Sequence, residues 1–438
     1  MIKITRRIKE IIERDKRVIM PTTRENYPFV SSHGDGDFVY DVAGNKFIDF
    51  SSFISVYNLG VNANRLVRNA VKNQADKLMH SAFTDFYSEL PVKFAENLLA
   101  LFPKGYGKVF FSNSGTEANE AALKFSRIFT KRQYTLAFYN AFHGRTLGSL
   151  SLTASKNVQR AGFGPFNSTI HVPFAYCYRC PFHMEYPSCN FACIDYIKDY
   201  PLSKEVSPSE VASIFVEPVQ GEGGYIVPPK DYFKKLKELA KENGILLVDD
   251  EVQAGYMRTG TFLGLDNFGV EADIYTMAKS LGGGLPIGAT ISRNSLGTIP
   301  PGSHANTFGG NLISIAAAEA SLNYVKRNMK SLSHDIKRKG NYIMKRLNEM
   351  KERYEIIGDV RGIGLMIGVE FVKDKYSKKY GIEERDKVLN ECFNNGLLML
   401  PTGVSAIRVI PPLTVKDSTI EKGLEIFENA VKKVSNKV

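Results

Sequence analysis

The chain has 438 residues, 43% of them hydrophobic, and a formal net charge of +11. This length is large for one core and predicts two domains, while the ordinary composition and the lack of a long apolar run argue against a membrane-spanning protein. Basic residues alternate with acidic ones and accompany no nucleic-acid-binding motif, so we expect neither a nucleic acid nor a membrane as partner. The basic N-terminus lacks the apolar core of a secretory signal, which favours a cytoplasmic protein.

The N-terminal half reads as a helix, a β-meander and then an α/β layer. Isoleucines on one side of the first twenty residues predict an amphipathic helix. Alternating apolar residues around Ala43-Gly44-Asn45 predict a β-hairpin or meander within residues 34–50. From there to about residue 310, apolar strands alternate with amphipathic helices, which is typical of α/β layers with a parallel sheet. The strands are predicted at residues 108–111, 212–216, 245–249 and 273–277, and the helices at 117–129 and 232–243.

The composition changes after residue 312. A long helical stretch at 312–352 precedes a strand pair around 360–372 and a closing helix from Lys416. This order of elements predicts a smaller α+β domain, and we expect the N-terminal segment to be part of it. The predicted ranges are 1–55 for the N-terminal segment, 56–311 for the large domain and 312–438 for the small domain.

One lysine stands directly before a glycine run, in the segment Ala278-Lys279-Ser280 followed by Leu-Gly-Gly-Gly. An unhindered lysine forms a Schiff base with an aldehyde cofactor or a carbonyl substrate. The glycines allow the backbone to approach a bulky bound group closely. Alone, the segment fits an ordinary turn equally well.

Further polar residues follow the predicted strands, where open parallel sheets bind their ligands. Residues 112–117 lie between a strand and a helix N-terminus, and they suit either a phosphate cradle or a helix cap without a ligand. The run Asp249-Asp250-Glu251 ends the most apolar strand, where an acid either caps a loop or holds the charge of a protonated ring nitrogen. Phe142 offers a ring to stack on a flat cofactor, or simply packs in the core.

Four of the five cysteines lie close together in the sequence. Cys177, Cys180, Cys189 and Cys193 form a C-x2-C pair and a C-x3-C pair. Close pairs of this kind occur in structural zinc sites, but they also form disulfides in hyperthermophiles or stay as reduced thiols. Because spacing alone does not choose among these states, we assign no metal and keep the cluster as a candidate.

Seven motifs occur in one order along the chain: SGTEAN, FHGRT, EPVQGEGG, DEVQAGYMRTG, AKSLGGGLPIGA, NTFGGN and IRVIPPL. Each is weak alone, but the ordered set is highly specific. From about Gly36 to its C-terminus the chain resembles the class III pyridoxal-phosphate (PLP) aminotransferases, which include 4-aminobutyrate, ornithine and acetylornithine aminotransferases. The resemblance implies an α/β enzyme of fold type I, in which a large domain with a mainly parallel sheet is joined to a smaller α+β domain. It also implies a homodimer or a dimer of dimers.

The resemblance assigns cofactor roles position by position. Lys279 would carry PLP as the internal aldimine and shuttle a proton between the substrate Cα and the cofactor. Asp250 would pair with the pyridine nitrogen, Gln253 would approach the ring hydroxyl, and Phe142 would stack on the ring. Ser114, Gly115 and Thr116 would hold the phosphate together with the partner's Thr307. The full set implied for the cofactor is Ser114, Gly115, Thr116, Phe142, His143, Glu217, Asp250, Gln253, Lys279 and Thr307.

Four further positions correspond to substrate-binding residues of the family. Arg145 and Arg408 are candidate carboxylate anchors, because a guanidinium binds a carboxylate through two hydrogen bonds. Glu222 matches the family glutamate that pairs with the arginine at 408, and this pair would open for 2-oxoglutarate and close for an ω-amino acid. Ile54 aligns with a pocket-wall residue of the 4-aminobutyrate enzymes. Taken singly, Arg145 or Glu222 also fits a surface ion pair.

Two features depart from the usual family pattern. Gly60-Val61-Asn62-Ala63-Asn64 replaces a histidine-containing motif, which is expected to alter the entrance to the site. The cysteine-bearing insert, residues 176–193, is longer than in typical relatives and resembles an archaeal-type branch. Some members of that branch resemble amino-acid racemases.

The sequence therefore predicts an aminotransferase that moves an amino group from an ω- or α-amino acid, 4-aminobutyrate-like, to 2-oxoglutarate. The alternative is a PLP-dependent racemase or epimerase, which returns the proton to the opposite face of Cα and needs a second acid or base. A non-catalytic binding protein is a third hypothesis, against which Lys279 and Asp250 argue.

Overall fold

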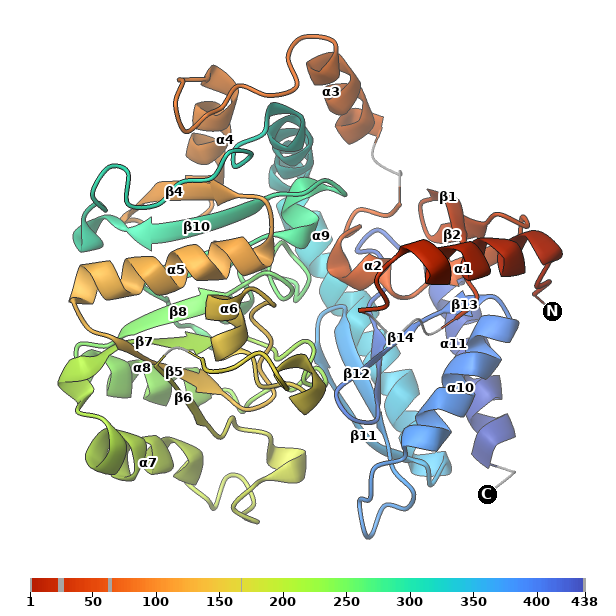
Figure 1. Cartoon of the computed structure of the whole chain (residues 1–438). Helices are drawn as coiled ribbons and strands as arrows, with labels where there is room; N and C mark the ends of the chain where they lie inside the picture. The colour runs from red at the N-terminus through yellow and green to blue at the C-terminus, as the bar shows by residue number, and fades with distance from the viewer. Residues whose placement is uncertain (1, 23–26, 62–64, 167, 436–438) are drawn as a thin grey trace. The chain divides into compact units, whose positions relative to one another are not determined.

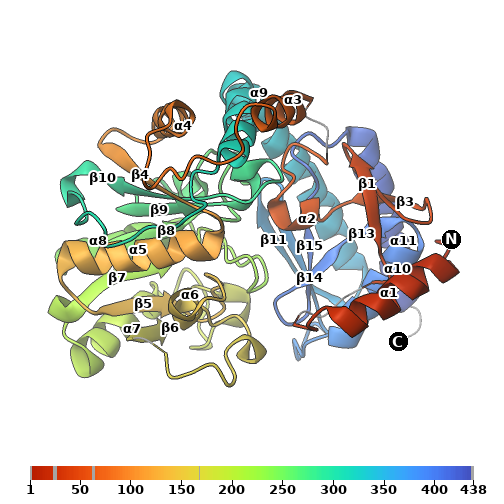
Figure 2. The same ribbon diagram turned by 45° about the horizontal axis from the view of Figure 1, so that its top comes forward.

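The computed structural model describes residues 2–22, 27–61, 65–166 and 168–435, and Figures 1 and 2 show its elements. The chain forms two compact units. The small unit contains Met1–Arg65 and Asp335–Val438, and the large unit contains Leu66–His334. The domain ranges inferred from the sequence stay a prediction. Asn62, Ala63 and Asn64, part of the altered entrance motif, lie outside the described residues.

Within the described residues, the large unit is built on a seven-stranded sheet of order β4-β10-β9-β8-β7-β5-β6. Strands β5 to β9 run parallel, while β10 is antiparallel to both of its neighbours, β4 and β9. The sheet is therefore mainly parallel, as the alternating pattern predicts. The strands are β4 (Tyr106–Ser112), β5 (Tyr134–Phe138), β6 (Thr169–Val172), β7 (Val211–Val216), β8 (Leu246–Asp250), β9 (Ile274–Met277) and β10 (Gly288–Arg293).

Helices cover both faces of this sheet. Helix α5 (Gly115–Thr130) crosses the front of the sheet in Figure 1, and α8 (Tyr232–Glu242) lies behind it. Small residues on one side of α5, Ala121 and Ala122, bring the helix close to Phe215 and Val248 of the sheet. Every residue of β7 is buried, as expected for a strand covered on both faces. The other helices that begin near or within this unit are α3 (Arg65–Ala75), α4 (Glu89–Leu99), α6 (Leu147–Leu152), α7 (Ala192–Asp199) and α9 (Leu312–Arg353).

The small unit contains two four-stranded sheets among its described residues, of order β1-β2-β3-β13 and β11-β12-β15-β14. The predicted meander is present as β1, β2 and β3, and Gly44 makes its turn with a φ of 81° that favours glycine. The strands are β1 (Ser31–Asp35), β2 (Phe38–Asp41), β3 (Lys46–Asp49), β11 (Ile357–Ile363), β12 (Met366–Phe371), β13 (Leu397–Leu398), β14 (Leu400–Thr402) and β15 (Ala406–Val409). The helices are α1 (Arg6–Val18), α2 (Ser52–Ser55), α10 (Ile382–Asn394) and α11 (Asp417–Ser435).

The topology of the large unit brings most of the candidate site residues to one edge of its sheet. Strands β5, β7, β8 and β9 are parallel neighbours, so their carboxyl ends lie along the same edge. The segments that follow them begin near Phe142, Glu217, Asp250 and Lys279 respectively. Crevices at this edge are where open α/β sheets bind ligands. Among the described residues, no helix is long and apolar enough to cross a membrane.

Candidate active site

The phosphate-binding candidates lie at the N-terminus of α5. Ser114 is the N-cap, and its Oγ accepts a hydrogen bond from the backbone N–H of Glu117 at 3.3 Å. Gly115 leaves no room for a side chain, since an added Cβ would lie 2.8 Å from a Cγ of Val252. Thr116 Oγ1 accepts bonds from the N–H groups of Arg145 and Thr146 at 3.2 and 3.3 Å. A helix N-terminus with small residues and a loop packed beside it is suited to bind an anion.

Asp250 ends β8 as a buried carboxylate held by three donors. Its Oδ2 lies 2.8 Å from Nδ1 of His143 and accepts from Asn119 Nδ2 at 2.7 Å. Its Oδ1 accepts from the N–H of Val252 at 3.0 Å. Burial disfavours a charged His143, yet the hydrogen bond to Asp250 and the nearby acid charges raise the pKa of this histidine above its usual range. The donors fix the Asp250 carboxylate in one orientation, and its negative charge is suited to a cationic ring nitrogen.

Glu217 follows β7 and connects two loops of the site. Its Oε1 accepts from the N–H of Phe142 at 2.9 Å, and its Oε2 accepts from the N–H of Gly221 at 2.8 Å. Burial raises the pKa of Glu217 to about 7, although the His143 charge and the two backbone donors lower it. Glu217 therefore positions the segment that carries Phe142, rather than facing solvent.

Gln253 lies three residues after Asp250 and is buried. Its Oε1 accepts from the hydroxyl of Tyr225 at 2.7 Å. Gly221 packs against it so closely that an added Cβ would lie 2.5 Å from Nε2 of Gln253. The side-chain amide of Gln253 is therefore held with Nε2 beside Gly221.

Lys279 follows β9 and begins the short turn Lys279–Gly282. Register pairs Asp250 with Thr276, so the lysine and the aspartate lie at the ends of neighbouring strands. Lys279 is half-buried and has a φ of 48°, in the left-handed region that non-glycine residues seldom adopt. Such backbone strain, on the order of 1 kcal/mol, is concentrated at functional sites.

The three remaining large-unit candidates are two exposed residues and one half-buried residue. Thr307 is exposed in the loop before α9, next to Asn306, whose Nδ2 donates to the Phe111 carbonyl of β4 at 2.9 Å. Arg145 is exposed, and its guanidinium carbon lies 5.6 Å from the centroid of the Phe142 ring. Glu222 is half-buried and its Oε1 lies 2.5 Å from Nζ of Lys156. Arg145 therefore lies beside the Phe142 ring, which is proposed to stack on the cofactor. Glu222 has Lys156 as a partner.

Ile54 and Arg408 belong to the small unit. Ile54 lies in α2, where four consecutive residues, Ser52 to Ser55, have a positive φ of 41° to 63°. Arg408 lies in β15, and its Nε and Nη2 donate to the Pro401 carbonyl at 3.2 and 2.9 Å. These two residues keep their proposed substrate roles as expectations from the family resemblance.

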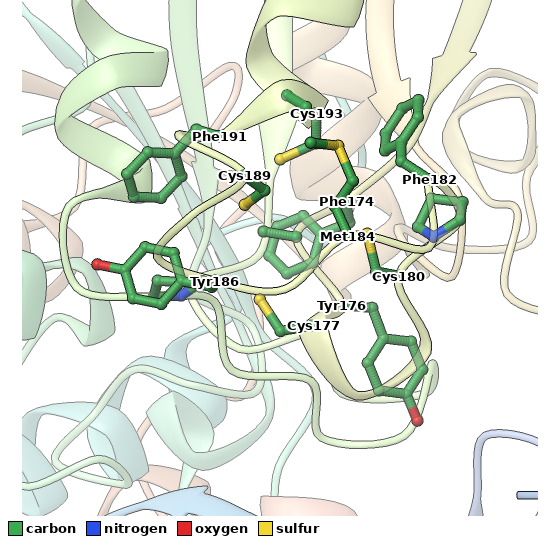
Figure 3. Close-up of a pocket in the computed structure, with 14 residues that line it drawn as sticks. Phe174, Tyr176, Cys177, Cys180, Phe182, Met184, Tyr186, Cys189, Phe191 and Cys193 are labelled. Atoms are coloured by element: carbon green, nitrogen blue, oxygen red, sulfur yellow. The ribbon is translucent and has the colours of Figure 1, made fainter.

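The four clustered cysteines line one small apolar cavity of about 20 Å³ in the loops around α7. Figure 3 shows the four cysteines around this cavity together with Phe174, Phe182 and Met184. Cys189 lies in the loop before α7, and Cys193 lies in the first turn of that helix. All four are free thiols, and no group of three or more histidine, cysteine or acidic side chains among the described residues is arranged to hold a metal. Burial raises the pKa of Cys193 to about 12, and the charges of the other three thiols act in the same direction. The four thiols line one cavity and interact across the two pairs, so the cluster stays a candidate and its state stays a prediction.

Sequence reasoning overlooked two residues that the fold brings to this site. Asn119 donates to both Asp250 and the His143 carbonyl at 2.7 Å, and Lys156 pairs with Glu222. Asn119 is inside the SGTEAN motif and is buried on the sheet-facing side of α5. An amide on the apolar side of the predicted helix is the sequence signal that could have identified it. Lys156 carries no such signal, since its partner is 66 residues away in the chain.

These residues fit PLP on their own chemistry. The helix N-terminus suits its phosphate, the buried Asp250 carboxylate suits its ring nitrogen, and Lys279 supplies the amine for its aldehyde. An aspartate that ends one parallel strand, a lysine that follows the neighbouring strand, and such a helix end together match a PLP enzyme of fold type I.

Comparison with known proteins identifies the family. The family model described as "Aminotransferase class-III" matches residues 19–431, so the chain belongs to the class III aminotransferases, which are PLP-dependent enzymes. The chain is 40% identical to a leucine/methionine racemase of Thermococcus litoralis, over 97% of this chain and 96% of that protein. It is 36% identical to a probable 4-aminobutyrate aminotransferase of Bacillus subtilis, over 90% of this chain and 91% of that protein. A crystal structure of a Bacillus anthracis aminotransferase superposes with a TM-score of 0.90 at 27% identity, covering 99% of this chain and 100% of that one.

Proposed function

We propose that this enzyme transfers an amino group from an ω- or α-amino acid, 4-aminobutyrate-like, to 2-oxoglutarate. The observation that carries the proposal is that Asp250 ends β8 and Lys279 follows β9, the neighbouring parallel strand, in a chain of the class III family. PLP, when bound, supplies a ring that takes up the electron pair left when the amino-acid Cα loses its proton. The proposal assigns this proton transfer to the Lys279 amine.

The remaining residues at this edge of the sheet hold the cofactor and fix its orientation. The Asp250 charge stabilises a protonated ring nitrogen, and His143 and Asn119 keep that carboxylate in place. Ser114, Gly115 and Thr116 bind the phosphate at the α5 N-terminus. Phe142 stacks on the ring, in a position that Glu217 fixes through the Phe142 N–H, and Gln253 approaches the ring hydroxyl.

The proposed substrate contacts are electrostatic. Arg145 and Arg408 bind carboxylates of the amino donor and of 2-oxoglutarate, and Ile54 forms part of the pocket wall. Glu222 adjusts this binding through its charge. The free thiols of the chain suit a reducing compartment such as the cytoplasm.

We also propose that the active form is a homodimer to which the partner's Thr307 contributes. Exposed apolar side chains support this: Met79, Phe86, Tyr87 and Phe308 are 58–103% exposed in the large unit. They belong to connected segments, because Asn311 donates to the Met79 carbonyl and the His80 and Phe308 rings lie 5.0 Å apart. Apolar patches of this kind mark interaction surfaces. Because Phe308 is next to Thr307, burying the patch would place that threonine at the subunit interface.

A racemase is the second candidate, and the 40% identity to the Thermococcus litoralis racemase favours it. Racemisation uses the same lysine and aspartate but needs no oxo acid. The two activities therefore differ in their dependence on an acceptor, which makes them separable in one experiment.

The test is chiral chromatography of an amino-acid panel incubated with the PLP-loaded enzyme, with and without 2-oxoglutarate. Glutamate that appears only with the acceptor supports the transaminase and ranks its donors. A D-enantiomer that appears without the acceptor overturns it in favour of the racemase. Lys279→Ala serves as the control, since it should abolish either product.

A further inference from the structure

The loop that carries Thr307 is tied to α5 by a lysine. Nζ of Lys124, in the second half of α5, donates to the Ser303 carbonyl at 3.1 Å and lies 2.8 Å from Nδ1 of His304. An ammonium group donates hydrogen bonds and accepts none, so Nδ1 accepts this one and the His304 ring is neutral, with its proton on Nε2. Lys124 thereby holds two consecutive residues of the loop.

The surroundings of His304 favour this neutral ring. Burial lowers the pKa of His304, and the Lys124 charge acts in the same direction, whereas Glu117 and Glu120 raise it. The ring also packs against Phe110 of β4, with the two ring centroids 4.8 Å apart. The bond from Lys124 therefore joins α5 to a histidine that already packs on the sheet.

Thr307 follows in a turn that is anchored to the same strand. Asn306 Nδ2 donates to the Phe111 carbonyl of β4 at 2.9 Å, and Asn306 Oδ1 accepts from the N–H of Gly309. Thr307, between these two residues, is exposed. The loop therefore presents a threonine on the surface of the large unit, a few residues after the contacts with Lys124.

We propose that Lys124 is a positioning residue for the phosphate site of the partner subunit, because it fixes the loop that presents Thr307. This inference rests on the proposed function, in which the partner's Thr307 contributes to each site. A loop that is not held in advance loses conformational entropy when it closes on a ligand, and this loss lowers the affinity. Lys124 therefore raises the PLP affinity of the subunit opposite to its own.

The first test measures PLP binding without turnover. The holoenzyme is dialysed against a series of PLP concentrations, and the visible absorbance of the bound cofactor gives the dissociation constant. In Lys124→Met this constant should rise roughly fivefold, the scale expected for hydrogen bonds at an exposed site. Lys124→Arg should restore the affinity, because a guanidinium also donates to both acceptors. Lys108→Met, which removes the same charge from an exposed residue of β4, is the matched control and should leave the affinity unchanged.

The second test uses hybrid dimers to decide which subunit feels the change. Two differently tagged chains are expressed together, and Lys279→Ala removes the cofactor absorbance of one of them. A Lys124→Met chain paired with a Lys279→Ala chain should bind PLP as tightly as the wild type, because the site that is observed receives an intact loop. A wild-type chain paired with Lys124→Met/Lys279→Ala should show the fivefold weakening, because the observed site receives the altered loop.

The reverse pattern in the two hybrids would mean that Lys124 acts through its own α5, and this result would overturn the proposal. Unchanged affinity in the Lys124→Met homodimer would overturn it as well, and so would a monomeric enzyme that forms no hybrids.

Thr307→Ala separates this inference from the function on which it rests. If Thr307→Ala leaves the PLP affinity unchanged, the proposed contribution of the partner's Thr307 fails and the inference fails with it. If Thr307→Ala weakens PLP binding and Lys124→Met does not, only the inference fails. Since PLP binding requires no turnover, these results do not depend on whether the enzyme is a transaminase or a racemase.

Discussion

At the scale of single residues, the edge of the sheet concentrates groups that are costly to bury. Asp250 is compensated by three donors, and Glu217 by two backbone N–H groups. Lys279 is held in a strained backbone conformation. Such costs are retained where they serve binding or chemistry, so these residues should affect activity far more than stability.

Lys279→Ala should abolish turnover and the visible absorbance of the bound cofactor. The variant should still fold, since Lys279 is only half-buried and follows β9 rather than lying in the core. Absorption spectra and circular dichroism of the PLP-incubated protein check both statements. Retention of wild-type turnover would rule out the assigned role.

Glu251 gives a prediction for stability against pH. Burial raises the pKa of Glu251 to about 7 from an ordinary value of 4.5, although Asp249 and two backbone donors lower it. A raised acid pKa favours folding below pH 4.5, and this contribution is lost as the pH rises through 7. Glu251→Gln removes the titration, so its unfolding free energy relative to the wild type should increase by up to about 3 kcal/mol between pH 4.5 and 7.5.

Urea unfolding at a series of pH values measures this difference. The exposed Glu352→Gln is the control, and its stability should stay parallel to that of the wild type because solvent screens the charge. A Glu251→Gln curve parallel to the wild type would contradict the prediction.

At the scale of elements, the first turn of α5 couples helix packing to anion binding. Gly115→Ala should weaken PLP binding by roughly tenfold, because the new Cβ meets Val252 and shifts the turn. Global stability should not fall in parallel, since alanine favours helix more than glycine does. Cofactor titration and thermal unfolding separate the two effects, and Gly115→Ala/Val252→Ala should recover the affinity.

The left-handed turn α2 is the second element with a clear consequence. Ile54 has a φ of 63°, which costs a β-branched residue about 1 kcal/mol or more. Ile54→Gly should therefore destabilise the chain less than Ile4→Gly, although both isoleucines are 39% exposed. The denaturant midpoints of the two variants measure this difference. An equal loss of stability in Ile54→Gly and Ile4→Gly would show that the turn is unstrained.

Most elements could be predicted from the sequence because their patterns are local. The strand predicted at 245–249 is β8 (Leu246–Asp250), and the helix predicted at 117–129 is α5 (Gly115–Thr130). Strand ends shift by a residue because an apolar run does not mark where pairing stops. The antiparallel insertion of β10 between β4 and β9 was not predicted, because strand order depends on contacts between distant segments.

The residues of the candidate site also fall into those that the sequence predicts and those that only the fold reveals. Lys279, Asp250 and the α5 N-terminus were recognisable from motifs, because each lies at the end of a predicted element. The partners Asn119 and Lys156 were not, because their roles depend on side chains that only the folded chain brings within 3 Å. The cysteine pattern leaves three states open, and the fold adds that all four thiols line one cavity, which spacing alone does not show.

At the scale of the whole molecule, we expect assembly and cofactor binding to depend on each other. Phe308→Asp places a charge in the exposed apolar patch beside Thr307, so it should yield monomers with weaker PLP affinity and low activity. Light scattering after size exclusion gives the mass, and cofactor titration gives the affinity. Tyr376→Asp, at a fully exposed aromatic residue of the small unit, should change neither. A Phe308→Asp variant that stays dimeric would remove this patch from the interface.

The division of the chain also sets an order of events during synthesis. The small unit draws on both Met1–Arg65 and Asp335–Val438, whereas Leu66–His334 form the large unit alone. Because a ribosome releases the chain from its N-terminus and compact regions fold as units, the large unit has all of its residues available first. The first segment of the small unit must then wait, with its β1–β3 meander lacking β13, until the last quarter of the chain emerges. A nascent chain stalled shortly after α9 should therefore already protect the large unit from proteolysis while its N-terminal segment is still cleaved.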